Sequence, residues 1–107
     1  MPERAAVHTA VERLAGRLRS LPQRRLQAGA AAEGLELARW LAREAQLLEF
    51  PGREPYEIPD DGLFVVGDQL AVAGNELLRA SANDPARAEA VLTEALERMA
   101  RTAKAVG

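Results

Sequence analysis

Apolar side chains recur along this chain with the spacing of an α-helix. Val7, Val11, Leu14, Leu18 and Leu21 follow one another at alternating intervals of four and three residues. Such spacing places them on one face of a helix, and that face must pack against another apolar surface. The residue types agree, because Ala, Leu, Glu and Arg dominate and β-branched residues are few. We therefore predict an all-α fold.

The apolar pattern divides into four stretches of similar length. Four such helices with short or moderate links are typical of a four-helix bundle, and we expect the up-down-up-down order. A chain of 107 residues suits one core, so residues 1–107 are predicted to form a single helical-bundle domain. The helices are expected over residues 2–20, 30–48, 61–82 and 85–104.

Breaks between these helices are marked by glycine, proline and capping residues. Gly29 is expected to interrupt the chain before the second helix, since glycine inside a helix costs about 1 kcal/mol. Asp84 followed by Pro85 predicts an N-cap with proline in the first turn. Ser20 with Gln23 reads as a capping box, and Asp60 or Asp61 as the cap of the third helix.

One long loop is expected between the second and third helices. Residues 50–62 contain three prolines and two glycines, which a helix interior does not tolerate. Charge is distributed unevenly around this loop: residues 1–30 carry +4, residues 31–62 carry −5, and the whole chain carries −2. Such separation can steer a charged partner, but the near-neutral total does not favour nucleic-acid binding.

Few residues can carry covalent or metal chemistry. The chain has no cysteine, which excludes disulfides and thiolate metal sites, and His8 is its single histidine. The serines, Ser20 and Ser81, lie at predicted helix ends with no histidine placed to activate them. We predict no catalytic residue, no metal and no cofactor. The lack of cysteine and of an apolar leader or membrane span indicates a cytoplasmic protein.

Paired carboxylates leave one enzymatic alternative open. Glu33 with Glu36 and Glu94 with Glu97 have a spacing that places each pair on one helix face. Such pairs could hold magnesium in a nucleotide or phosphoester hydrolase. A second acidic motif on the facing helix would be needed, and the third helix does not offer one at the right spacing. A solvated surface is the preferred explanation of the pairs.

A basic cluster stands at the end of the first helix and the start of the next segment. It could contact phosphates, but no aromatic residue is interleaved with it. The preferred interpretation is either a solvated helix end or contact with the acidic loop residues Glu54, Glu57, Asp60 and Asp61 of another subunit. The cluster consists of Arg13, Arg17, Arg19, Arg24 and Arg25.

Polar residues within apolar arcs are the candidate binding residues. Glu44 has Trp40 one turn before it, and it is either a ligand contact or a flank residue satisfied by a neighbouring arginine. Asp68, Asn75 and Arg79 follow one another at seven and four residues, which places them on one line of the third helix. This line is either a recognition strip or a narrow solvent-facing edge.

Surplus apolar residues on the second and third helices predict self-association. Four short helices have too few buried faces to hide all the Leu, Val and Phe of residues 30–82. We expect a non-enzymatic interaction or regulatory module, acting as a homodimer or with another protein. The residues expected in the contact are Trp40, Leu47, Phe64 and Leu78.

Overall fold

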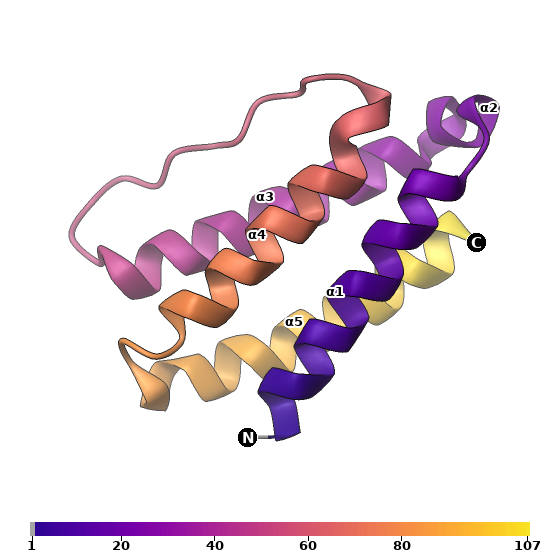
Figure 1. Ribbon diagram of the computed structural model, residues 1–107. Helices are drawn as coiled ribbons and strands as arrows, with labels where there is room; N and C mark the ends of the chain where they lie inside the picture. Colours follow the sequence, from indigo (N-terminus) through magenta and orange to yellow (C-terminus); the bar gives the residue numbers. More distant parts are fainter. Residues whose placement is uncertain (1) are drawn as a thin grey trace.

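The computed structural model describes the chain from Pro2 to Gly107, and within that range it contains four long helices and no strand (Figure 1). The predicted all-α four-helix bundle is therefore confirmed. The long helices are α1 (Pro2–Ser20), α3 (Ala31–Glu49), α4 (Val66–Ala80) and α5 (Pro85–Val106). A short helix α2 (Gln23–Arg25) leads into a π-helical turn (Leu26–Ala30), and a 3-10 turn (Leu63–Val65) precedes α4.

Helix directions differ from the predicted up-down-up-down order. Gly67, at the start of α4, lies against Arg19 at the end of α1, so these helices are antiparallel. Gly34, near the start of α3, lies against Val66 at the start of α4, so α3 and α4 are parallel. The order is therefore up, down, down, up (Figure 1).

The long loop explains this difference. An extended segment of the length of residues 50–62 can reach about 40 Å, whereas a helix of 19 residues such as α3 is about 28 Å long. The loop therefore returns along the whole of α3 before α4 begins (Figure 1). Each helix then has one parallel and one antiparallel neighbour, with α1 and α4 in front of α3 and α5 in the view.

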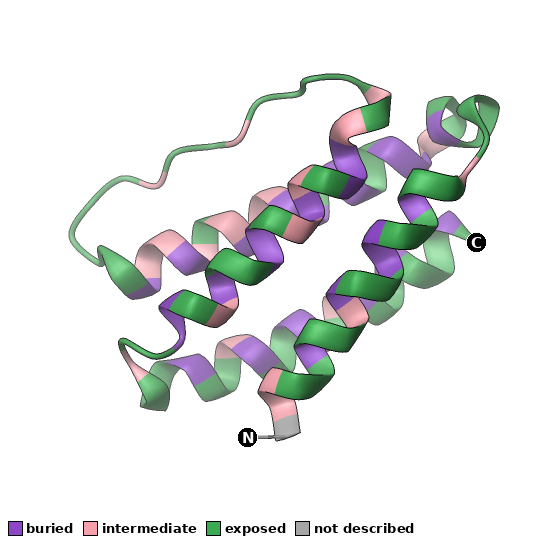
Figure 2. Cartoon of the chain, viewed as in Figure 1, coloured by how far each residue is buried: buried purple, intermediate pink, exposed green. Residues whose placement is uncertain are grey.

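The buried side chains form one stripe along each long helix, as the periodicity predicted (Figure 2). The same spacing on the later helices predicts Leu63 and Ala103 as core residues. Leu63, like Leu21, is only partly buried, and Ala103 is exposed because Thr102 and Val106 face inward on α5. Burial of one such leucine or valine stabilises the fold by about 1.5–3 kcal/mol. The predicted core residues that are buried include Val7, Val11, Leu14, Leu18, Leu37, Leu41, Leu48, Val66, Leu70, Leu77, Leu92 and Met99.

Helix boundaries test the predicted caps. Gly29 has a φ of 138° and interrupts the helical path, which confirms the break. The Asp84 carboxylate accepts a hydrogen bond from the Arg87 N–H at 3.2 Å, which confirms that cap. The other two caps are wrong: the Ser20 hydroxyl donates to the Arg17 carbonyl, and the Asp60 carboxylate accepts from the Gly62 N–H in a local turn.

Replacing Gly74 with alanine should destabilise the bundle. A Cβ at this position would lie 2.6 Å from Cγ2 and 2.7 Å from Cγ1 of Val11, a residue with no exposed surface. We expect the free energy of unfolding to fall by about 1–3 kcal/mol, measured by urea denaturation. Gly16→Ala is the matched control: nothing lies within 4 Å of its new Cβ, and helix propensity should raise stability by about 0.5–1 kcal/mol. Unchanged stability of Gly74→Ala would contradict the close approach of α1 and α4.

Candidate functional site

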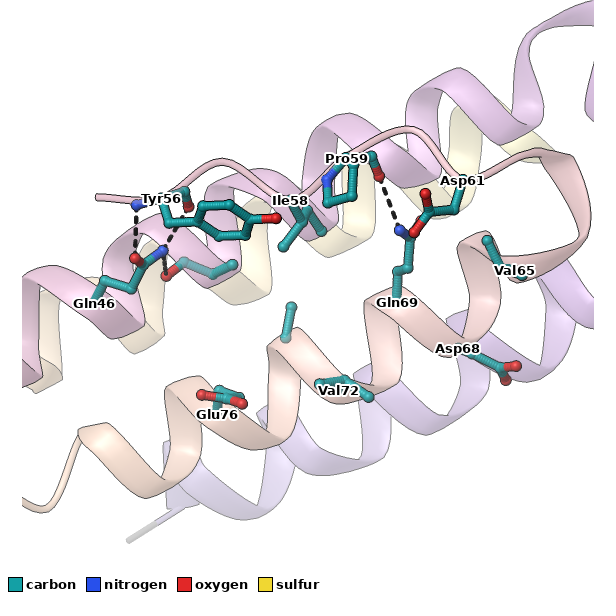
Figure 3. A pocket seen from close by; sticks show the side chains of 12 residues that line it. Gln46, Tyr56, Ile58, Pro59, Asp61, Val65, Asp68, Gln69, Val72 and Glu76 are labelled. Atoms are coloured by element: carbon teal, nitrogen blue, oxygen red, sulfur yellow. Dashed lines mark hydrogen bonds between the residues drawn. The ribbon is translucent and has the colours of Figure 1, made fainter. Parts of the chain in front are cut away.

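A groove of about 610 Å³ lies between the returning loop and the helices α3 and α4 (Figure 3). Small apolar side chains of both helices form its floor, and the loop passes along one side of it. Apolar concave surfaces with a few placed polar groups are the usual form of binding sites. The lining residues are Ala42, Gln46, Tyr56, Ile58, Pro59, Asp61, Val65, Asp68, Gln69, Val72, Ala73 and Glu76.

Three helix side chains hold the loop beside the groove. Gln46 donates to the Tyr56 carbonyl at 2.8 Å and accepts from the Tyr56 N–H at 2.7 Å, as a neighbouring strand would (Figure 3). Arg39 donates to the Ile58 carbonyl at 2.9 Å, and Gln69 donates to the Pro59 carbonyl at 2.9 Å. Together these bonds hold the backbone of residues 56–59 beside the two helices.

The charged residues that line the groove are all acidic. Asp61, Asp68 and Glu76 contribute carboxylates, and the lining contains no Arg or Lys. The Gln69 Oε1 atom is buried and accepts no hydrogen bond from any described residue. A buried acceptor of this kind can be satisfied by a water molecule or by a donor from a ligand. The groove therefore favours occupants with donors or positive charge.

Large apolar side chains remain exposed around this groove. Tyr56, Phe64 and Val72 have relative exposures of 67%, 69% and 59%. Phe50, at the start of the loop, is also exposed and carries the Arg53 guanidinium 5.2 Å from its ring centroid. Tyr56 and Val72 line the groove, whereas Phe50 and Phe64 lie at opposite ends of the returning loop. Exposed apolar side chains of this size are typical of interaction surfaces.

The predicted polar line on α4 lies on the outside of that helix. Asp68, Asn75 and Arg79 are all exposed, and only Asp68 reaches the groove. Asp68 Oδ1 accepts a hydrogen bond from Arg19 Nε at 2.8 Å, which ties α4 to α1. Val72, which lies between Asp68 and Asn75 in the sequence, makes this surface partly apolar.

Trp40, Glu44 and Leu47 lie on a different side of the bundle. The Arg98 guanidinium of α5 stacks over the Trp40 ring with its carbon 4.5 Å from the centroid, which places Trp40 at the seam between α3 and α5. Glu44 and Leu47 follow one and two turns later on the same flank and are partly buried. The structure therefore does not bring Glu44 to the line on α4.

The residues expected at an interface do not form one surface. Phe64 is exposed at the start of α4, whereas Leu78 is packed against the core near the end of that helix. The Leu78 carbonyl accepts from Arg4 of α1 at 2.8 Å, which places it at the seam between α1 and α4. Because Leu47 lies at the seam between α3 and α5, only Phe64 belongs to the exposed face around the groove.

The first carboxylate pair faces positive charge. Glu33 and Glu36 of α3 line a cleft of about 220 Å³ whose other side carries Arg98 and Arg101 of α5. Arg98 also forms an ion pair with Glu94 at 2.8 Å. A magnesium-dependent hydrolase needs a second carboxylate pair at this place. Two guanidinium groups lie there instead, and their positive charge disfavours the binding of a magnesium ion. Among residues 2–107 no group of three carboxylate or histidine side chains gathers as a metal site would require.

Most of the basic cluster is engaged within the fold. Arg17 donates to the Gly107 carbonyl, Arg25 donates to the Val106 carbonyl at 2.8 Å, and Arg19 holds Asp68. These contacts fasten the end of α5 to α1 and α2, and the start of α4 to the end of α1. Arg13 lines a shallow groove between α1 and α5.

Sequence reasoning missed the residues that shape the groove. Gln46, Gln69 and Arg39 are unremarkable on helices, and their role appears only once the path of the loop is known. Within the described chain, no helix is both long and apolar enough to cross a membrane. No family model matches this chain, and no curated protein or solved structure is significantly similar to it.

Replacing Gln46 with alanine should loosen the loop without unfolding the bundle. The Tyr56 N–H and carbonyl would both lose their partner, so its amide should exchange with solvent faster. We expect the free energy of unfolding to fall by about 0.5–1.5 kcal/mol. Hydrogen exchange followed by mass spectrometry measures the first effect. Gln27→Ala, at an exposed position of the π-helical turn, is the control, and equal Tyr56 exchange in both variants would show that Gln46 does not hold the loop.

Proposed function

We propose that this chain is a non-enzymatic helical interaction module that associates with a second copy of itself through the outer face of α4 and the adjoining groove. One observation carries the proposal. The large apolar side chains that are strongly exposed all lie between residues 50 and 72, on the loop and the first half of α4 and its preceding turn. Burying such surface contributes about 25 cal/mol per Å².

The placement of polar side chains supports a role without catalysis. Ser81 is occupied in the fold, since its hydroxyl donates to the Leu78 carbonyl at 2.6 Å and accepts from Arg4. The Glu33 and Glu36 pair, on which a magnesium-dependent hydrolase would depend, faces Arg98 and Arg101. Neither arrangement prepares a nucleophile or a metal site. The interaction module is therefore the better-supported function.

Introducing a charge at Val72 should weaken self-association. Val72 is 59% exposed and glutamate is a good helix former, so Val72→Glu should keep the fold while it places a carboxylate in the proposed contact. We expect the dimer dissociation constant to rise about tenfold or more. A substitution at the centre of a contact typically weakens the free energy of binding by on the order of 1 kcal/mol or more. Sedimentation velocity over a range of protein concentrations measures it.

Ala90→Glu supplies the matched control. Ala90 is exposed on α5, and α4 and α5 lie diagonally across the bundle because each packs against α1 and α3. This variant carries the same new charge and should dimerise like the unmodified chain. A monomeric unmodified chain at tens of micromolar, or equal dissociation constants for both variants, would refute the proposal.

A further inference from the structure

The outer face of α4 carries opposite charges at its two ends. Asp68 and Arg79 are separated by three helical turns, about 16 Å along the axis, and they point within about 20° of each other. Asn75 lies between them on the same line, and Val72 borders it. A surface with this distribution of charge is complementary to itself when one copy is reversed.

We propose that the second copy docks with its α4 antiparallel to the first, so that Asp68 of each copy faces Arg79 of the other. A two-fold contact makes each such pair occur twice. The parallel alternative would place Asp68 against Asp68 and Arg79 against Arg79, and like charges across an interface are unfavourable. The charges therefore select the antiparallel orientation.

The same register places apolar surface at the centre of the contact. When residue 68 lies opposite residue 79, residue 72 lies opposite residue 75. The two Val72 side chains are then about 4.5 Å apart along the helix axis. Val72 is largely exposed within one copy, so the two can cover each other between the two charge pairs. This arrangement resembles the apolar centre and polar rim of protein interfaces.

Both charged groups are available for this contact. The Asp68 side chain is 68% exposed. Arg19 donates to only one of the two Asp68 carboxylate oxygens, Oδ1. Arg79 is exposed and forms no side-chain hydrogen bond or ion pair with another described residue. Arg19 also holds the Asp68 carboxylate in place beside α1, where it can accept from a second guanidinium.

Charge reversal tests this orientation, which rests on the proposed self-association. Arg79→Asp should raise the dimer dissociation constant at least about tenfold, because two attractive pairs become repulsive. The double variant Asp68→Arg with Arg79→Asp restores opposite charges across the contact. It is made together with Arg19→Gln, so that the arginine introduced at position 68 does not meet the Arg19 guanidinium, and it should return the constant to near that of Arg19→Gln alone. Sedimentation velocity at low and high salt measures each constant, and thermal melting verifies that each variant is folded.

Lys104→Asp, at an exposed position of the diagonally opposite α5, is the control for the change in net charge and should dimerise normally. Dimers that are insensitive to Arg79→Asp, or that the double variant fails to restore, would overturn the antiparallel register and leave self-association standing. An unmodified chain that stays monomeric would instead refute the proposed function itself. The register would be supported if the double charge reversal recovers the affinity that Arg79→Asp loses, and if the affinity also falls at high salt.

Discussion

The direction of α4 in this bundle depends on the path of the returning loop, which runs back along α3 before α4 begins (Figure 1). Gln46, Arg39 and Gln69 pair with backbone groups of residues 56–59, which have no secondary-structure partner of their own. These bonds fasten the extended path beside α3, and α4 begins next to the start of α3. From that position α4 runs antiparallel to α1, and the two helices approach closely where Gly67 lies against Arg19 and Gly74 against Val11.

The groove is a consequence of the same path. A helix lying along the outer side of α3 and α4 would cover that side with side chains. The extended loop segment covers only a narrow strip of it. Ile58 packs against the core, but Tyr56 stays exposed and Val72 stays uncovered. The loop is held by side-chain hydrogen bonds at a few points and has few buried contacts, so it belongs to the least stable part of the fold.

Local signals in the sequence predicted the helices and their core well. The spacing of Val7, Val11, Leu14 and Leu18 requires only that a helix has one buried face, and the Asp84 cap depends on residues within one turn. The direction of α4 could not be predicted in this way, because a loop of this length can close either a hairpin or a crossover. The spacing of Asp68, Asn75 and Arg79 placed them on one face, but the roles of Gln46 and Gln69 depend on where the loop lies.

The shape of the molecule explains why a single copy leaves apolar surface uncovered. Its Cα positions extend over 41 × 29 × 16 Å, and helix axes in contact are about 8–10 Å apart, so the thinnest direction holds only two layers of helices. A chain of this size buries a smaller share of its surface than a larger domain does. Every helix is therefore exposed on its outer side. Among the long helices of the described chain, α4 is the one that carries a strongly exposed large apolar side chain, Val72, and Phe64 stands just before it. A second copy on that side would add the layer that the short chain cannot supply, and the opposed charges of Asp68 and Arg79 would determine how the layer is oriented.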